Sequence, residues 1–454
     1  MRTIYATGWH ALVCASGILF ASAALADWQP VWSTPWQHPT PFHSASPWRV
    51  RVAADGATFA VVDAVHDGLA HIALMRFEDD GQFAWLQEHA AASVAGIAFV
   101  GADRVAIAGD DGNVGAPIYI RLHDVASGAL IWEHHAAGGR SVADAGTDTP
   151  QVVVDASGNL MVLASDHGDF VVIRLAADGT PLPTWRRSVD ASADVLATAL
   201  VALADGGVAI SGRGRILGGG NITIRLDALG QEVFTDVEVV GPFPYGPAFL
   251  GADGDGNLVV AAAQETANGS PLAQVWKLSP SGQRLWTRIL PNPLGPTSAS
   301  SPGGFALTAN GDALVELDEG AGARFRVVRL AAASGEVLWD SHAPIGGTPS
   351  TMALAANGRL LVGGSAPIGG GHVRGRIVEF DASGEPCRVS METGAFSSVA
   401  VAPGAKGWAM LGATTFVQGL GNEAFASRFD ADGPCSAGDP LFADGFEPIA
   451  LPQE

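Results

Sequence analysis

Lysine, cysteine and long apolar runs are scarce in this chain. Lys277 and Lys406 are its only lysines, and 46 acidic residues face 25 basic ones, which gives a formal net charge of −21. Nucleic-acid binding depends on clustered Lys and Arg that neutralise phosphates, so this composition excludes a nucleic-acid partner. Beyond residue 26 no apolar run approaches the roughly 18 residues that a membrane-spanning helix needs, so we expect no membrane span.

The first 26 residues have the pattern of a secretory signal peptide. Arg2 precedes an apolar stretch, Ala11–Ala21, and the small residues "ALA" at 24–26 form a cleavage site before "DW". We therefore expect an exported protein, either periplasmic or extracellular, whose mature chain begins at Asp27.

Three cysteines are present, and Cys14 lies inside the signal peptide. The other two, Cys387 and Cys435, would reach an oxidising compartment, where paired cysteines form disulfides. We predict a Cys387–Cys435 disulfide. Two separate buried thiols are the alternative.

A repeat of about 50 residues runs through the chain. Each copy alternates short apolar, β-branched runs with Gly/Asp/Asn turns, most clearly in residues 149–185. Four strands in about 50 residues describe one propeller blade. The sequence therefore predicts an all-β fold, a single eight-bladed β-propeller of four-stranded antiparallel blades over residues 48–440. The turn glycines that mark the copies are Gly81, Gly128, Gly179, Gly230, Gly282, Gly335, Gly384 and Gly433.

The last copy lacks an outer strand, because "GPCSAGDP" (433–440) is rich in Gly and Pro and poor in strand formers. Residues 27–47 offer a replacement, since "QPVWSTPW" (29–36) resembles "ALIWEHHA" in the second copy. We predict that Val31–Ser33, with Trp32 in the role of the repeated Trp, pairs with the third strand of repeat 8 around Ala424–Phe429. This N-terminal strand would close the ring and leave residues 441–454 as a C-terminal tail.

An aromatic and a basic residue flank the turn glycine in most copies. Trp follows the glycine by four residues in "GQFAW", "GALIW", "GQRLW" and "GEVLW", and Arg or Lys precedes it by five to seven residues, with Glu379 as the exception in repeat 7. Hairpin register places the two side chains opposite each other on one face of the blade. We therefore expect cation–π stacking of Arg76 on Trp85 and of Lys277 on Trp286.

This Trp spacing resembles the blade repeat of the pyrroloquinoline-quinone propeller superfamily, over Trp48 to about Asp439. The resemblance implies the propeller fold. Quinone-dependent dehydrogenases of that superfamily hold their cofactor with a vicinal cysteine pair and a calcium site, and this chain has neither adjacent cysteines nor a CxxCH haem motif. We therefore expect no cofactor.

A metal site is not expected either. The stretch "DGDGN" (253–257) alternates carboxylates as calcium loops do, but Ala261 stands at the ninth position, where many such loops place another acid. Sister repeats have "DASGN" and "TANGD" at the same point, so an ordinary turn is predicted.

Connections between the first and second strands and between the third and fourth strands are short and uniform, whereas the other two sets vary. In a propeller both variable sets emerge on one face, and variable loops on a rigid scaffold usually carry binding. Solvated loops without a binding role are the alternative. The candidate ligand-binding residues on that face are Arg213, Arg215, Phe243, Tyr245, His372, Arg374 and Arg376.

We therefore expect a monomeric, exported, non-enzymatic propeller that acts as a binding or scaffold module for a protein, a glycan or a small anionic ligand. The alternative is a propeller enzyme, such as a lyase, a hydrolase or a degenerate quinoprotein, with its site at the central mouth. The sequence names no catalytic residue, because it contains neither a GxSxG nor an HExxH motif. Converging acids or histidines with shifted pKa values at the mouth would favour the enzyme.

Overall fold

The computed structural model describes most of the chain between residues 30 and 430. The described ranges are 30–36, 44–66, 69–90, 93–110, 117–136, 151–166, 168–189, 195–214, 220–239, 248–265, 270–293, 300–319, 324–369, 372–405, 407–414 and 424–430. In these ranges every regular element is a β-strand, and no helix is long and apolar enough to cross a membrane. The proposed signal peptide and the tail 441–454 lie outside the described residues.

The strands form eight four-stranded antiparallel blades, as predicted. Blade 1 contains β2 (Ser44–Val52), β3 (Thr58–His66), β4 (Leu69–Phe77) and β5 (Phe83–Ala90). Blade 2 contains β6 (Ser93–Val100), β7 (Arg104–Asp110), β8 (Ile118–Asp124) and β9 (Leu130–Ala136). Blade 3 contains β10 (Val152–Val154), β11 (Leu160–Asp166), β12 (Asp169–Leu175) and β13 (Pro181–Ser188). Blade 4 contains β14 (Leu196–Ala202), β15 (Val208–Gly214), β16 (Gly220–Leu226) and β17 (Glu232–Val239).

The remaining blades follow the same order. Blade 5 contains β18 (Phe249–Ala252), β19 (Leu258–Glu265), β20 (Pro271–Leu278) and β21 (Arg284–Leu290). Blade 6 contains β22 (Ser301–Leu307), β23 (Ala313–Asp318), β24 (Arg324–Leu330) and β25 (Val337–Gly346). Blade 7 contains β26 (Thr348–Leu354), β27 (Leu360–Gly369), β28 (His372–Phe380) and the first half of β29 (Pro386–Gly404). Blade 8 contains the second half of β29, β30 (Gly407–Thr414), β31 (Ala424–Asp430) and β1 (Trp32–Trp36).

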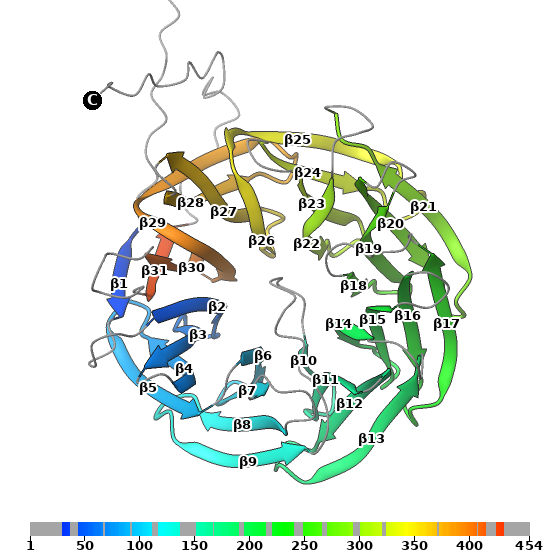
Figure 1. Cartoon of the computed structure of the whole chain (residues 1–454), viewed down its shortest axis with the longest axis horizontal. Helices are drawn as coiled ribbons and strands as arrows, with labels where there is room; N and C mark the ends of the chain where they lie inside the picture. Colours follow the sequence, from blue (N-terminus) through cyan, green and yellow to red (C-terminus); the bar gives the residue numbers. More distant parts are fainter. Residues whose placement is uncertain are drawn as a thin grey trace, which may run out of the picture.

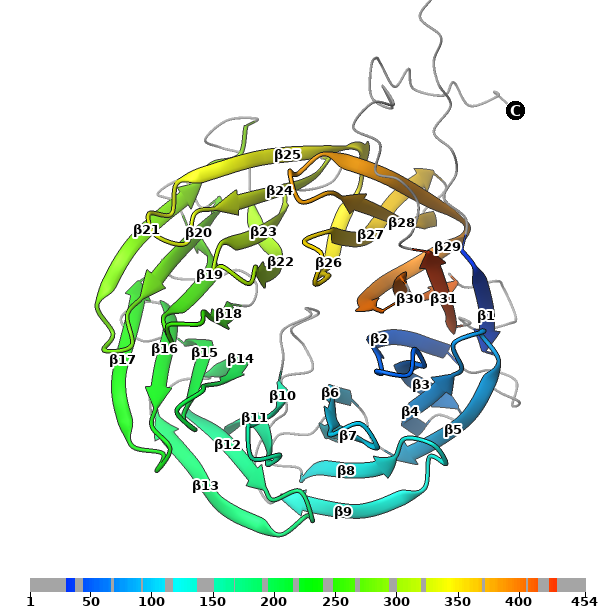
Figure 2. The same cartoon turned by 180° about the vertical axis from the view of Figure 1, so that it is seen from behind.

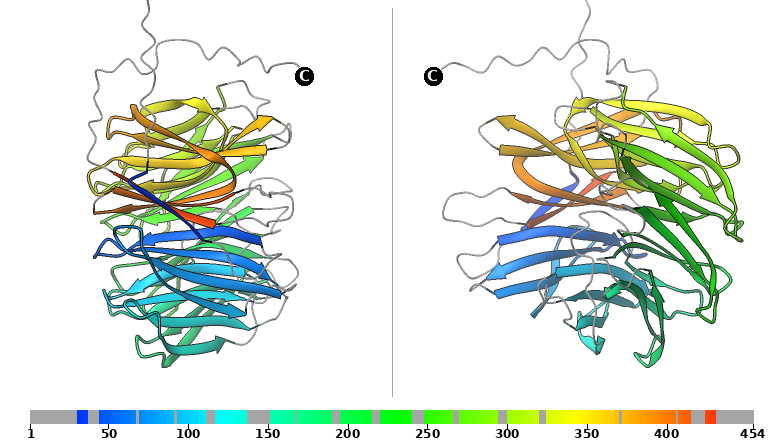
Figure 3. Two further views of the ribbon diagram at one scale, coloured as in Figure 1. Left: turned by 90° about the vertical axis from the view of Figure 1, so that its left-hand side faces the viewer. Right: turned by 45° about the vertical axis from the view of Figure 1, so that its right-hand side comes forward.

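The blades stand around a ring, and the four strands of each blade lie in order from the centre to the rim (Figures 1 and 2). We call them A, B, C and D in that order, so that they are β2, β3, β4 and β5 in blade 1 and β1 is strand D of blade 8. Seen edge-on, the strands cross the thickness of the ring, so each connection lies at one of its two ends (Figure 3). The A–B and C–D turns share one end, which we call the turn end. The B–C and D–A connections share the other, which we call the loop end.

The hydrophobic core lies between neighbouring blades. One apolar cluster joins Val100 and Leu122 of blade 2 to Val152 and Leu160 of blade 3, and similar clusters occupy the other seams between blades. Strands B and C are therefore covered on both faces, which explains their nearly continuous apolar sequence, whereas the outer strand β9 alternates between exposed and half-buried residues.

The repeated Trp joins its blade to the next one. The Trp85 ring of blade 1 packs on the C–D turn of blade 2 at Gly128, where φ is +72° and an added Cβ would lie 2.7 Å from Trp85 Cδ2. Only glycine satisfies both this backbone conformation and this close approach. The same contact joins Trp32 to Gly81, Trp132 to Gly179, Trp185 to Gly230, Phe234 to Gly282, Trp286 to Gly335 and Trp339 to Gly384.

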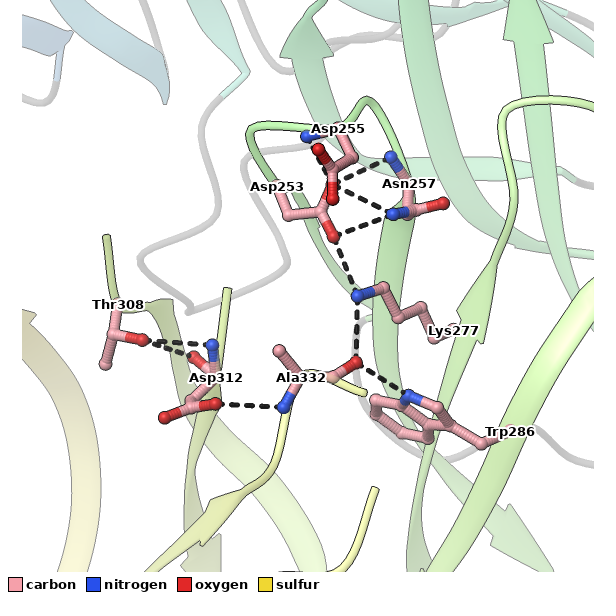
Figure 4. Close-up of polar contacts among 8 residues, drawn as sticks. All are labelled: Asp253, Asp255, Asn257, Lys277, Trp286, Thr308, Asp312 and Ala332. Atoms are coloured by element: carbon pink, nitrogen blue, oxygen red, sulfur yellow. Dashed lines mark hydrogen bonds and ion pairs between the residues drawn. The ribbon is translucent and has the colours of Figure 1, made fainter. Parts of the chain in front are cut away.

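Hydrogen bonds complete this inter-blade latch. Trp286 Nε1 and Lys277 Nζ both donate to the carbonyl oxygen of Ala332 in the next blade, at 3.1 and 2.8 Å (Figure 4). Trp85 Nε1 and Arg76 Nη1 converge in the same way on the carbonyl oxygen of Val125, at 3.2 and 2.7 Å. Each cation is also paired within its own blade, as Lys277 is with Asp253 at 2.7 Å.

The predicted cross-strand register is confirmed, because Arg76 lies opposite Trp85 and Lys277 lies opposite Trp286. The predicted stacking is present at Arg174, whose guanidinium carbon lies 3.9 Å from the centre of the Trp185 ring. For Arg76 and Lys277 the stacking prediction is wrong. These cations reach past the ring to a carbonyl of the next blade, a contact that exists only once the blades are assembled.

Blade 7 builds the latch with the charges reversed. Glu379 stands where other blades have Arg or Lys, and Arg388 stands opposite it in place of Trp. Glu379 accepts hydrogen bonds from Arg388 and from Trp408 Nε1, the latter at 2.9 Å. Arg388 Nη1 then donates to the carbonyl oxygen of Asp430 in blade 8 at 2.8 Å. In blade 7 the hydrogen bond to a carbonyl oxygen of the next blade thus comes from a strand-D cation. In blade 5 the corresponding donors are a strand-C cation, Lys277, and Trp286.

The N-terminal strand closes the ring as predicted. Strand β1 pairs antiparallel with β31, with Trp32 opposite Arg428 and Ser33 opposite Ser427. Trp32 Nε1 donates to the carbonyl oxygen of Asp79 in blade 1 at 3.0 Å, and Thr34 Oγ1 donates to that of Gly81 at 2.7 Å. The outer strand of blade 8 therefore comes from the opposite end of the chain, and its Trp has the repeated role.

Removing this strand should weaken the whole ring. A shortened chain that begins at Ser44, which keeps β2 whole, should melt roughly 5 °C or more below the chain that begins at Asp27, because it exposes the edge of β31 and the apolar surface that Trp32 and Trp36 cover. Differential scanning calorimetry measures the difference. Equal melting temperatures would show that β1 does not hold the ring closed.

The hydrogen bond of the latch can be isolated by a matched pair of substitutions. Trp286→Phe keeps an aromatic ring on Gly335 but removes the bond to Ala332, and should lower the free energy of unfolding by about 0.5–1.5 kcal/mol beyond the packing change. Trp339→Phe is the control, because the buried Nε1 of Trp339 has no hydrogen-bond partner among the described residues. Urea denaturation that finds the same loss for both variants would contradict this role of the bond.

Candidate functional site

A groove opens between blades 6 and 7 at the turn end of the ring. It has a volume of about 630 Å³ and is lined by the A–B turns of both blades and by the C–D turn of blade 7. Leu307, Leu314, Leu354 and Leu360 give it aliphatic walls. These two blades lie side by side at the top of Figure 1, where β22 and β26 are adjacent. A volume of this size is within the range of small-molecule sites.

The groove coincides with a looser latch. Trp339 still packs on Gly384, but its buried Nε1 finds no acceptor among the described residues, and Arg329 alone donates to the turn carbonyl of Ala382, at 3.1 Å. The Arg329 side chain is 21% exposed, against 7% for Lys277 in the preceding seam, where both donors are engaged (Figure 4). The seam between blades 6 and 7 is therefore less tightly closed at the turn end than its neighbour.

Charges in the groove are neutralised locally. Arg329 Nε and Nη2 donate to Asp312 Oδ2 at 3.1 and 2.7 Å, and the backbone N of Ala332 donates to Asp312 Oδ1 at 2.9 Å. Burial works to raise the pKa of Asp312, but these bonds from Ala332 and Arg329 hold the pKa below its usual range. Asp312 is thus an ionised carboxylate at neutral pH, engaged in structure and unsuited to donate a proton.

Two amide side chains and one carboxylate border the groove. Asn357 Oδ1 accepts a bond from the backbone N of Arg359 at 3.1 Å, and Asn310 Nδ2 donates to Asp312 Oδ2 at 3.2 Å. Asp381 Oδ1 accepts bonds from the backbone N atoms of Ser383 and Glu385 at 2.8 and 3.0 Å. These turns hold the polar groups in place while leaving amide N–H groups and one carboxylate oxygen toward solvent.

The sequence-based candidates that the structure describes lie toward the other end of the ring. Arg213 lies near the end of β15 in blade 4, and His372, Arg374 and Arg376 lie in the first half of β28 in blade 7, next to the B–C connections of their blades. Arg215, Phe243 and Tyr245 lie outside the described residues. A composite site made of these residues therefore stays a prediction.

The predicted Cys387–Cys435 disulfide also involves a residue outside the described part of the chain. Cys387 lies at the start of β29 and takes part in a disulfide. Cys435 lies outside the described residues, so the Cys387–Cys435 pairing stays a prediction.

The stretch "DGDGN" forms the A–B turn of blade 5. Asp253 accepts bonds from the backbone N of Asp255 and from both the backbone N and the amide of Asn257, and it pairs with Lys277 (Figure 4). Its oxygens therefore close the turn and hold the latch cation. In the described part of the chain no group of three or more His, Cys, Asp or Glu side chains is arranged to hold a metal ion.

An acid with a raised pKa lies in the seam between blades 1 and 2. Burial raises the pKa of Asp63 on β3 to about 7, an effect that Arg49 opposes and Asp110 reinforces. Its Oδ1 is buried without a hydrogen-bond partner among the described residues. Since Asp63 is packed between blades and away from the groove, it does not form a catalytic pair with the groove residues.

A histidine pair lies in the same seam. His89 Nε2 and His123 Nε2 lie 3.2 Å apart, and His123 Nδ1 contacts the carbonyl oxygen of Gly128 at 3.0 Å. Burial, together with nearby Arg121 and His123, lowers the pKa of His89 to about 4. Both rings are therefore neutral at pH 7, which suits a packed seam between two blades.

The groove could not be found from the sequence. Its walls are ordinary turn residues such as "TANGD" (308–312) and "AANGR" (355–359), which match other copies of the repeat. A hint was the missing acid in "AANGR", since the A–B turns of blades 1, 4, 5 and 6 each carry an Asp that pairs with a strand-C cation. The missing acid can be connected with a groove only when the contact of Trp339 with blade 7 is known.

The titration of Asp63 gives a testable pH dependence. The pKa of Asp63 is about 7 in the folded chain and 3.8 in the unfolded chain. Between pH 3.8 and pH 7 the folded state therefore keeps a proton that the unfolded state has lost. The stabilising contribution of Asp63 is therefore present at low pH and lost as pH rises through 7. The free energy of unfolding of Asp63→Asn, measured relative to that of wild type, should therefore increase by roughly 1–4 kcal/mol when the pH is raised from 4 to 8. Urea denaturation at both pH values measures this, with exposed Asp255→Asn as control, and a pH-independent difference would refute it.

The sequence matches no protein-family model, and a search of curated proteins finds no match. Solved structures are similar in fold. A structure of the eukaryotic initiation factor has a TM-score of 0.44 at 11% identity, covering 84% of this chain and 84% of that chain. The Dos1 propeller has a TM-score of 0.46 at 9% identity, covering 73% and 92%. The dihydro-heme d1 dehydrogenase NirN in complex with DHE has a TM-score of 0.50 at 14% identity, covering 90% and 78%. At these identities the similarity concerns the fold alone.

Proposed function

We propose that this protein is an exported, non-enzymatic binding module and that the groove between blades 6 and 7 is one of its binding surfaces. The observation that carries the proposal is the groove itself, an apolar-walled hollow bordered by fixed polar groups at a seam whose latch is loosened. Pockets with apolar walls and a few oriented polar groups are the usual form of ligand sites. Export rests on the signal-like residues 1–26.

The loop end is the second candidate surface. The two ends of the ring differ, because the turn end carries the uniform turns of the latches and the loop end carries the connections that vary between repeats. Variable loops on a rigid scaffold usually carry binding, and this supports the loop end as a binding surface. Arg213 and Arg376 lie in strands that lead into or out of those connections. An anionic ligand or an acidic protein segment would suit this end.

An enzyme is the alternative function. It would require acids or histidines with shifted pKa values that face a common cavity. Among the described residues, Asp63 and His89, with pKa values shifted to about 7 and about 4, lie instead in the seam between blades 1 and 2. A relationship to the pyrroloquinoline-quinone propeller superfamily is also proposed, on the repeated Trp spacing alone, and it brings no cofactor with it.

The binding role is tested with a variant that fills the groove. Ala356→Trp places a large side chain in the exposed A–B turn of blade 7, and Ala204→Trp makes the same change at the equivalent turn of blade 4 as a matched control. A library of neutral, anionic and cationic metabolites is screened by thermal shift, because a ligand of the folded state raises its melting temperature. We expect stabilising compounds that act on wild type and on Ala204→Trp but not on Ala356→Trp.

Two outcomes would contradict the proposal. Compounds that stabilise Ala356→Trp as strongly as wild type would show that the groove is not their binding site. If the same compounds no longer raise the melting temperature of Arg213→Ala, their binding site is at the loop end. If no compound stabilises the wild-type chain, the protein is not a small-molecule binding module.

A further inference from the structure

We infer that the ligand of the groove is an uncharged saccharide, an inference that rests on the binding role proposed above. The charges of the groove disfavour anionic and cationic ligands, while its hydrogen-bond donors and acceptors and its apolar walls match a sugar.

An anionic ligand is disfavoured by the charges around the groove. Arg329, the one cation among the described residues that line it, is already paired with Asp312 through two nitrogens. Asp381 adds a second carboxylate, and the whole chain has a net charge of −21. An anion would therefore have to compete with Asp312 for Arg329 in a negative potential.

A cationic ligand finds its two possible partners largely occupied. Asp312 receives Arg329 on one oxygen and the backbone N of Ala332 on the other. Asp381 Oδ1 receives two backbone N–H groups and the hydroxyl of Ser383, the last at 2.6 Å. N–H and O–H donors thus already stabilise both negative charges, so an ammonium group gains little by approaching them.

The remaining polar groups match hydroxyls. The amide nitrogen of Asn357 has no partner among the described residues, and the Nδ2 of Asn310 uses one N–H on Asp312 and keeps another. Asp381 Oδ2 supplies an acceptor. Fixed donors and acceptors on one rim suit a ligand whose hydroxyls both donate and accept.

The walls match the apolar face of a sugar ring. Leu307, Leu354 and Ala355 present aliphatic surface between the polar turns, so a ring with C–H groups on its face and hydroxyls at its edge covers both kinds of surface. A volume of about 630 Å³ leaves room for more than one ring. Trp339 also lines the groove and adds aromatic surface to the aliphatic walls.

Isothermal titration calorimetry with sugars that differ mainly in charge tests the inference. The probes are glucose, glucosamine and glucuronic acid, with cellobiose, maltose and N,N′-diacetylchitobiose as longer neutral ligands. We expect a neutral disaccharide to bind about tenfold more tightly than either charged monosaccharide. Asn357→Ala and Asp381→Ala should each weaken that binding about fivefold or more, while Asp227→Ala, the equivalent turn acid of blade 4, leaves it unchanged. Melting temperatures close to wild type show that each variant is folded.

The outcomes separate this inference from the proposed function. Tighter binding of glucosamine or glucuronic acid, or saccharide binding that Asn357→Ala and Asp381→Ala do not weaken, would overturn the saccharide assignment. If no saccharide binds while library compounds still distinguish Ala356→Trp from Ala204→Trp, the ligand class is wrong and the binding role stands. If neither saccharides nor library compounds bind, both proposals fail.

Discussion

The inter-blade latch is the contact on which the ring depends. An aromatic ring on strand D of one blade packs against a glycine in the C–D turn of the next, as Trp286 does on Gly335, and the indole N–H and a strand-C cation meet one carbonyl oxygen of that turn. The latch ties the outer strand of each blade to its neighbour, while apolar side chains fill the seam further in. Blade spacing is thus set at the rim by hydrogen bonds and inside by packing.

The same contact explains how the chain ends are used. A ring whose last blade lacked strand D would leave the edge of β31 unpaired and the turn at Gly81 without its aromatic partner. Strand β1 supplies both the strand and Trp32. Blades 7 and 8 are joined differently, because the single strand β29 forms the outer edge of one blade and the inner edge of the next. Blade 8 is thus joined to blade 7 by a continuous strand, and its outer strand β1 bonds to blade 1 through Trp32 and Thr34.

The groove lies beside a blade that departs from the repeat. In blade 7 the latch pair is Glu379 and Arg388, and Arg359 of its A–B turn pairs with Glu379, whereas an acid of that turn pairs with the strand-C cation in blades 4 and 5. Trp339 packs on the C–D turn of this blade at Gly384, but its Nε1 has no hydrogen-bond partner among the described residues. Repeat proteins tolerate such departures because each blade contacts only its neighbours, and a loosened seam between rigid blades can serve a ligand.

The sequence by itself determined the all-β class, the eight blades, their turns and the closing strand at Trp32. These follow from local rules, the two-residue period of strands and the glycine turns, repeated until the number of copies settles the architecture. Only the tertiary structure decided what the repeated side chains do. Arg76 and Trp85 were expected to stack on each other, but they share a carbonyl oxygen of another blade, 40 or more residues away in sequence. The groove also depends on the tertiary structure, because its lining residues come from two blades. No local sequence pattern predicts how those two blades pack against each other.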